Sequence, residues 1–333
     1  MVARIGNGDA SLTSILSRQS SALRAELTRR TTEMTTGLHT DMGAAVGGDF
    51  SALAAVDHSL ARLKGYAANT AEAGLFTDVL QNALGVISDA ATDLSTNIMR
   101  SVGSSNAISL DAIATDAGRA FATAVAAVNT RFSERAIFSG VNAETQPLPD
   151  AQTILSQLET AVAGAITVQD VQNAVVAWFS DPGGYETAYV GGAPREAAQI
   201  APGETADMSV TALDPAVKDT LRGLATVALL GRGLLAGQVE ARSQLAKAAS
   251  EELMTGGEAR SHLMARVGTV QAQIAAAQTR NTAEDSALTI ARAGIVTADP
   301  YDAATRIEDL QTQLQALYLI TARVSRLTLA EYI

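Results

Sequence analysis

Apolar residues recur at helical spacing at both ends of this chain, as far apart in the sequence as two segments can be. Near the start, an eleven-residue repeat appears twice, in Leu12, Leu23 and Met34 and in Leu16, Leu27 and Leu38. Near the end, the repeat is seven residues, in Leu310, Leu317 and Val324, with Ile307, Leu314 and Leu327 in the same helix. Such narrow stripes predict helices that need a partner helix rather than a broad globular core. The partner can be the other end of the chain, a neighbouring subunit, or both.

The composition favours close helix packing and excludes several classes of function. Hydrophobic residues make up 47% of the 333 residues but aromatic residues only 4%, so the apolar surface is mostly Ala, Leu and Val. Such surfaces let helices approach closely but do not form the aromatic-lined pocket of a small-molecule enzyme. The net charge of −11 argues against binding to nucleic acid or to an anionic membrane, because phosphate groups need clustered Lys and Arg.

The sequence contains no cysteine, which excludes disulfides, thiolate metal ligands and cysteine nucleophiles. This absence favours an extracellular protein that has no disulfides. An ordinary cytoplasmic protein is the alternative. Residues 1–9 have neither the apolar core nor the cleavage site of a secretory signal, so export would need another machine. No apolar run approaches the roughly 20 residues of a membrane-spanning helix.

Helical spacing along the chain predicts long helices around one segment of different character. The helices are expected at residues 11–37, 50–98, from Ile108 to Gly140, 216–254, from about 258 to 295, and 301–330. Gly256 and Gly257 are expected to separate two of them. Between residues 141 and 215 lie six of the seven prolines, the only tryptophan and several β-type runs, with strands expected at 187–190, 197–200 and 207–211.

These elements predict a mainly α fold. Both termini are expected to form a long antiparallel helical rod or coiled coil, and a small mixed α/β domain is inserted in the helical frame. The expected parts are terminal coiled-coil helices at 1–45 and 300–333, a helical rod domain at 46–140 and 216–299, and an outward insert at 141–215.

No arrangement of residues predicts catalysis. The histidines His39, His58 and His262 are expected to be surface or boundary residues rather than metal ligands. The neighbouring acids at 251–252 and 284–285 diverge on a helix, and the Gly-rich stretches lack phosphate-binding patterns. We therefore expect a protein that is not an enzyme, with no catalytic, metal-binding or cofactor-binding residues and no cofactor.

The segment from Asn129 to Gly140 is typical of a helix C-terminus. Arg131 and Arg135 are four residues apart, Phe138 follows, and Gly140 suits a left-handed cap. This pattern, Asn-x-Arg followed by Ile-Phe-Ser-Gly and then by a Pro-containing insert, resembles the bacterial flagellin superfamily.

The C-terminus narrows the resemblance. Residues 299–306 (Asp-Pro-Tyr-Asp-Ala-Ala-Thr-Arg), 311–318 (Gln-Thr-Gln-Leu-Gln-Ala-Leu-Tyr) and the tail 325–333 resemble the flagellin-like hook-associated proteins of the hook–filament junction. Residues 265–274 and 280–281 resemble the penultimate helix of the same group. Filament flagellins usually carry Ser-Ser-Gly-x-Arg-Ile and then an Asp-Asp pair after the first helix. Here residues 35–39 correspond only loosely, and Gly47-Gly48-Asp49 stands in place of the acidic pair.

The resemblance implies a structural adaptor at the hook–filament junction of the bacterial flagellum, and so an extracellular location after a cytoplasmic stage. It implies export in the unfolded state through the flagellar type III apparatus, and terminal helices that fold as subunits stack into a ring. The implied partners are other copies of the chain, the other hook-associated junction protein, flagellin and an export chaperone. A filament flagellin and a non-exported coiled-coil scaffold are the alternatives.

Overall fold

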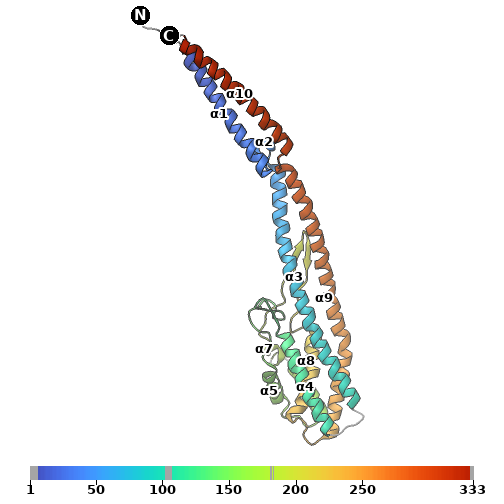
Figure 1. The fold of residues 1–333 in the computed structure, drawn as a ribbon. Helices are drawn as coiled ribbons and strands as arrows, with labels where there is room; N and C mark the ends of the chain where they lie inside the picture. Colours follow the sequence, from blue (N-terminus) through green and yellow to red (C-terminus); the bar gives the residue numbers. More distant parts are fainter. Residues whose placement is uncertain (1–6, 102–106, 181, 183, 331–333) are drawn as a thin grey trace. The chain divides into compact units, whose positions relative to one another are not determined.

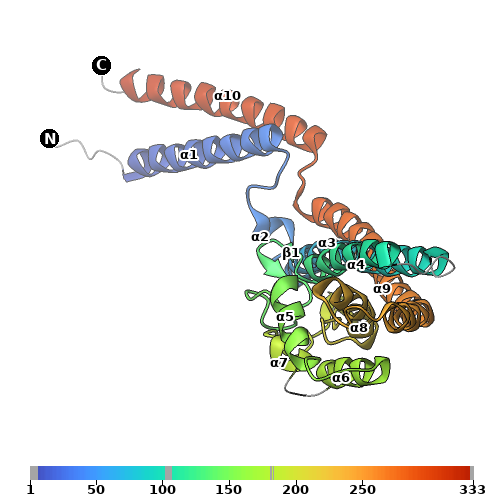
Figure 2. The same ribbon diagram turned by 90° about the horizontal axis from the view of Figure 1, so that it is seen from below.

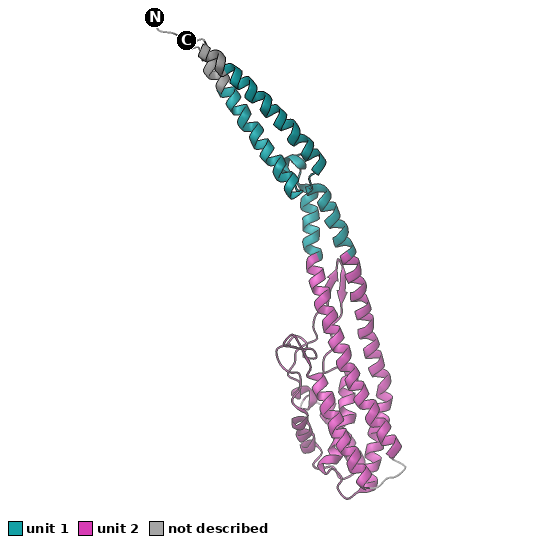
Figure 3. Ribbon diagram, viewed as in Figure 1, with its two compact units in different colours: residues 1–63, 283–333 teal, residues 64–282 magenta. Residues whose placement is uncertain are grey.

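The computed structural model describes residues 7–101, 107–180, 182 and 184–330, and it confirms the predicted mainly α fold (Figure 1). Contacts divide the chain into two compact units, one of residues 1–63 with 283–333 and the other of residues 64–282 (Figure 3). The helices are α1 (Asn7–Thr36), α2 (Met42–Ala45), α3 (Ser51–Ser101), α4 (Ala107–Val128), α5 (Ala151–Ala161), α6 (Val168–Ser180), α7 (Tyr185–Ala188), α8 (Pro215–Ala228), the 3-10 helix η2 (Leu229–Arg232), α9 (Val239–Val296) and α10 (Pro300–Ala330). The strands are β1 (Arg131–Phe132), β2 (Arg135–Ala136), β3 (Ala198–Ala201) and β4 (Glu204–Ala206).

In the first unit, α1 and α10 lie side by side and antiparallel (Figures 1 and 2). The chain leaves α1 and enters α10 through two segments that pair with each other. His39 N–H donates to Val296 O at 2.9 Å, and Ala298 N–H donates to Gly37 O at 3.0 Å. Gly37 has φ +70°, a conformation that glycine adopts at little cost. These bonds fix which residues of α1 lie opposite α10.

The second unit contains the large apolar core. It is formed by α4 and α8, which pack along each other, and by the portions of α3 and α9 within residues 64–282. Helices α3 and α9 run antiparallel. Gln271 of α9 donates to Asp78 of α3 at 2.7 Å, and further along, Ser250 Oγ of α9 donates to Ser95 O of α3 at 3.1 Å. Alanines occupy many fully buried positions where helices meet, among them Ala91, Ala117, Ala124, Ala225 and Ala246. Small side chains at these positions let the helix backbones approach closely.

The insert packs around one aromatic cluster. Phe179 and Tyr185 stack with their ring centroids 5.2 Å apart, and Trp178 meets Phe179 edge to face at 4.9 Å. The Tyr185 hydroxyl donates to Ala212 O at 2.9 Å, which satisfies the buried phenol. Burial raises the pKa of Tyr185 far above its ordinary value, so the group stays protonated.

The structure corrects several predictions in and beside the insert. A strand at 187–190 is wrong, because residues 185–188 form the helical turn α7, which buries Tyr185 and Ala188 together. The strand expected at 197–200 is confirmed as β3, but its partner β4 comes at 204–206, before the expected 207–211. Gly203, with φ +74°, makes the turn between them. A helix boundary at Gly256–Gly257 is also wrong, since α9 passes through both glycines without a break.

The helix expected to run to Gly140 instead ends at Val128, and a two-stranded hairpin follows. Phe132 pairs with Arg135 across a two-residue turn of Ser133 and Glu134, which have φ +47° and +63°. Positive φ at both central residues is the geometry that hairpin turns favour. This turn contains no glycine to mark it in the sequence. The helical spacing of the surrounding residues therefore extended the predicted helix through the turn.

Replacing Glu134 by Gly should stabilise the second unit by about 0.5–1 kcal/mol, since glycine tolerates positive φ and glutamate does not. The measurement is the unfolding midpoint in urea. Glu134→Gln is the matched control, because it keeps the strained backbone and should change nothing beyond the loss of an exposed ion pair with Arg131. A Glu134→Gly variant less stable than the Gln variant would contradict the prediction.

Among the described residues, none of the helices combines the length and the apolar character that a bilayer crossing requires.

Candidate assembly surface

The inner face of the α1–α10 pair carries the apolar stripes. On α10, Leu310, Leu314 and Leu317 are 8%, 7% and 6% exposed, and Ala303 is buried on the same face. The residues around them, such as Gln313, Gln315 and Ala316, are exposed. This spacing of three, four and seven residues is that of a helix facing one partner, and that partner in the structure is α1 of the same chain.

The matching face of α1 follows the same seven-residue spacing rather than the eleven-residue repeat. Leu16, Leu23 and Leu27 are half-buried, and the polar Ser20 and Arg30 take the positions between and after them. Met34, which continues the eleven-residue repeat, is half exposed at 50%. A seven-residue register is the one that keeps two helices in contact as they coil about each other.

The remaining predicted interface residues divide into two groups. Ile307 and Val324 of α10 are half-buried on the face that Leu310 and Leu317 share. Leu12 and Leu327 lie within α1 and α10, but their side chains are outside the described residues, as is the tail at 331–333. The role of all these residues in contacts between subunits remains a prediction.

Polar contacts fix the register of the pair. Tyr318 Oη of α10 accepts hydrogen bonds from Arg24 Nε and Nη2 of α1 at 3.0 and 2.9 Å, and the guanidinium carbon lies 5.7 Å from the ring centroid. Further along α1, Arg30 donates to Glu26 and to Glu33, both at 2.9 Å. The Glu33 side chain is almost fully buried, and its Oε1 accepts the Thr40 N–H at 3.0 Å. These charges therefore tie the end of α1 to the segment that follows it.

Replacing Tyr318 by Phe should lower the stability of the α1–α10 pair by about 0.5–1.5 kcal/mol, the net value of a hydrogen bond, because only the acceptor is removed. Circular dichroism at 222 nm during heating measures the effect. Tyr301→Phe is the matched control: that ring is 81% exposed on the same helix. Equal midpoints for the two variants would mean that the Arg24 contact adds nothing to the pairing.

The first unit also exposes several large apolar side chains. We call the following set the exposed apolar set: Ile15, Met34, Leu38, Phe50, Ile290, Tyr301, Leu319 and Ile320. Ile290, Tyr301 and Leu319 are each more than 70% exposed. On α10, Leu319 follows Tyr301 by about five full helical turns, so the two share one side of the helix, away from Leu314. Large apolar side chains exposed close together on a helix, as Leu319 and Ile320 are, are typical of a surface that another protein covers.

Sequence reasoning missed most of this set, since it looked for apolar residues at stripe positions. The signal that could have found Leu319 and Ile320 is the run Tyr318-Leu319-Ile320, which places apolar side chains around more than one face of α10. Ile290 stands similarly alone on the polar surface of α9.

The predicted motif at 131–140 lies in the second unit and holds the insert. Arg135 donates to Glu72 of α3 at 3.3 Å, and Arg131 donates to Glu144 O at 3.3 Å. Phe138 is fully buried, and its carbonyl accepts the Ala212 N–H at 3.0 Å. Gly140 has φ +60°, and a Cβ there would clash with the carbonyl of Ala193. These residues therefore connect the insert to α3.

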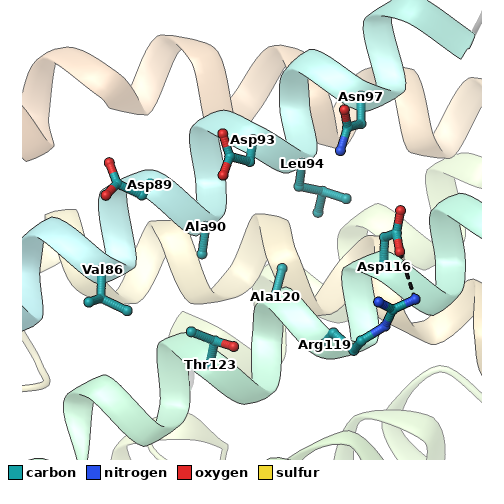
Figure 4. Close-up of a pocket in the computed structure, with 10 residues that line it drawn as sticks. All are labelled: Val86, Asp89, Ala90, Asp93, Leu94, Asn97, Asp116, Arg119, Ala120 and Thr123. Carbon is teal, nitrogen blue, oxygen red and sulfur yellow. Dashed lines mark ion pairs between the residues drawn. The ribbon is translucent and has the colours of Figure 1, made fainter.

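A groove of about 470 Å³ lies between α3 and α4 in the second unit (Figure 4). Asp89 and Asp93 reach it from α3, and Asp116 reaches it from α4, where it pairs with Arg119 at 3.0 Å. Within the described ranges, no group of three or more His, Cys, Asp or Glu side chains is placed to hold a metal ion. One contact escaped the sequence analysis: Glu258, four residues before His262, lies 3.5 Å from its ring, and both side chains are exposed.

Residues 257–333 match the family model of the bacterial flagellin C-terminal helical region. The C-terminal region is flagellin-like. The match includes all of α10 and the second half of α9, and it confirms the resemblance to the flagellin superfamily that the tail indicated. The helix that carries the seven-residue stripe, with Tyr301, Leu319 and Ile320 of the exposed apolar set, therefore lies inside the flagellin-like region.

One solved structure shares the fold of about three quarters of the chain. The crystal structure of FlgL from Bacillus cereus aligns with a TM-score of 0.53 at 16% sequence identity, covering 72% of this chain and 100% of that one. A proposed flagellar hook-associated protein from Vibrio parahaemolyticus aligns with a TM-score of 0.44 at 15% identity, covering 73% of this chain and 92% of that one. No curated protein matches the sequence significantly.

Proposed function

We propose that this protein is a structural component of the bacterial flagellum that joins the hook to the filament. The observation that carries the proposal is the combination of a flagellin-like C-terminal region with a fold that spans the full length of Bacillus cereus FlgL. The exposed apolar set supports it, because a protein that works by assembly needs apolar surface for its neighbours to cover.

In this proposal the terminal helices perform the assembly. The pair of α1 and α10 forms within one chain through Leu310, Leu314 and Leu317, and the exposed apolar set then contacts neighbouring copies in a ring. In the single chain the exposed apolar set faces solvent, and in the ring the neighbouring copies would cover it. The chain would reach this place through the flagellar type III apparatus, and flagellin, the other hook-associated junction protein and an export chaperone would be its partners.

Deleting the gene and inspecting cells by electron microscopy tests the proposal. A junction protein predicts hooks that persist without filaments, with flagellin released into the medium. Complementation with the intact gene should restore filaments. Intact filaments in the deletion strain would exclude the junction role.

A filament flagellin is the second candidate, because the family match at 257–333 describes flagellins in general. Abundance separates the two functions. A filament subunit dominates the protein of sheared flagella, whereas a junction protein accounts for a small number of copies in each flagellum.

A further inference from the structure

A buried arginine in the second unit has no acidic partner among the residues that the structure describes. The Arg260 side chain of α9 is only 6% exposed. Its Nη2 donates to Leu253 O at 2.9 Å, and its Nη1 lies 3.4 Å from Thr220 Oγ1, while Nε has no hydrogen-bond partner among the described residues. Burial lowers the pKa of this guanidinium, as desolvation disfavours the charged form. A buried cation without a counter-charge is costly to a fold.

The void beside Arg260 provides no acceptor for its Nε among the described residues. One side of Arg260 borders an enclosed void of about 10 Å³, lined otherwise by the apolar residues Leu84, Ile87, Ala216, Val217, Leu263 and Met264. A bound water needs two to four polar partners, and this void provides one. The missing acceptor must therefore come from the other side of the residue.

On that other side, two glycines lie over the guanidinium. A Cβ at Gly256 would stand 3.3 Å from Arg260 Nη1, and a Cβ at Gly257 would stand 3.6 Å from Nη2. Gly-Gly in the middle of a helix costs about 2 kcal/mol relative to two alanines. Here the two glycines place no side-chain atoms next to the Arg260 guanidinium.

Gly257 and Arg260 line an open groove of about 570 Å³ between α3 and α9. Met99 and Met254 are 46% and 57% exposed at its walls, and methionines adapt to varied apolar side chains. The full lining contains two arginines, three hydroxyl side chains and no acid: Thr92, Ser95, Thr96, Met99, Arg100, Met254, Gly257 and Arg260. An apolar wall with positive charge at the floor matches an apolar ligand that carries one negative charge.

We propose that this groove binds an acidic peptide segment of another protein, with a Glu or Asp carboxylate pairing with Arg260 and a neighbouring apolar side chain lying between Met99 and Met254. Pairing would provide the acceptor that the guanidinium lacks, and charge-assisted bonds of this kind are among the strongest hydrogen bonds in proteins. The site is separate from the terminal helices, so its test does not depend on the proposed flagellar role.

The probe is a labelled, capped hexapeptide Ala-Leu-Leu-Glu-Leu-Ala, titrated with the full-length chain and followed by fluorescence anisotropy. The matched probe carries Gln in place of Glu. We expect the Glu peptide to bind at least tenfold more tightly than the Gln peptide, and Arg260→Met to weaken the Glu peptide by at least tenfold. The same variant should keep or raise the thermal midpoint of the free chain, because it removes an unpaired buried charge.

Two glycine substitutions on α9 provide a test that keeps Arg260. Gly257→Ala adds a methyl group above the guanidinium, whereas Gly268→Ala adds one where no atom lies within 4 Å. Both should raise helix stability by similar amounts, but only Gly257→Ala should weaken the Glu peptide, by about fivefold or more. If Arg260→Met does not fold, this pair decides the question.

Equal affinity for the two peptides, or no binding of either, would overturn the proposal. So would equal affinities of Gly257→Ala and Gly268→Ala for the Glu peptide. A dimer of the chain alone in sedimentation velocity, lost in Arg260→Met, would place a second copy in the groove and overturn the choice of partner.

Discussion

Leu314→Asp should abolish assembly while the second unit stays folded. Leu314 is 7% exposed in the middle of the stripe by which α10 faces α1. Removing it forfeits about 1.5–3 kcal/mol of apolar burial, and the buried carboxylate adds a desolvation cost. The loss falls on a two-helix contact with little other core, so the pair should separate. Once the pair separates, no ordered α10 holds Tyr301, Leu319 and Ile320 in place for contact with another subunit.

Two measurements separate the units. Trp178 is the only tryptophan and belongs to the second unit, so its fluorescence during urea unfolding reports on that unit alone and should not change. Circular dichroism should show a loss of helix that corresponds to the first unit. Leu314→Met, which keeps the volume, should assemble normally. Filaments of normal length on cells that produce Leu314→Asp would refute a role for this face.

The sequence predicted the α10 stripe well because the information is local. A helix that faces one partner must place apolar residues at three- and four-residue spacing, and Leu310, Leu314 and Leu317 do so in the structure. The α1 stripe shows the limit of the same reasoning. Leu12, Leu23 and Met34 repeat at eleven residues, but Met34 is half exposed, since the partner helix and the paired segments at Gly37 and Ala298 decide which side of α1 is covered.

The errors elsewhere come from conformations and contacts that local patterns do not encode. Ser133 and Glu134 turn a hairpin at positive φ without glycine, where the surrounding residues continue a helical spacing. Gly256 and Gly257 are typical of a helix break in the sequence, but α9 continues through both, with the Arg260 side chain beside them. Most of the exposed apolar set was missed, because its members lie outside the stripe spacing that marks a helix facing one partner.

Leu319→Asp should abolish assembly by a different route, without harming the single chain. Leu319 is 73% exposed on α10 and lies on the side away from α1, where it shares a face with Tyr301. A charge there stays in water in the free chain, so helix content and thermal midpoint should equal those of the unchanged protein. Between subunits the same charge would be buried against apolar neighbours, at a cost of several kcal/mol for each contact, and a ring repeats that cost at every subunit.

The comparison of Leu319→Asp with Leu314→Asp therefore distinguishes pairing within the chain from contact between chains. Both should fail to restore filaments in a deletion strain, but only Leu314→Asp should lose helix as a purified protein. Gln313→Asp introduces the same charge at an exposed polar position of α10 and should restore filaments. If Leu319→Asp restores them equally well, α10 uses only its inner face, and the surface that joins one copy to the next must lie on other members of the exposed apolar set, with Ile290 of α9 the next to test.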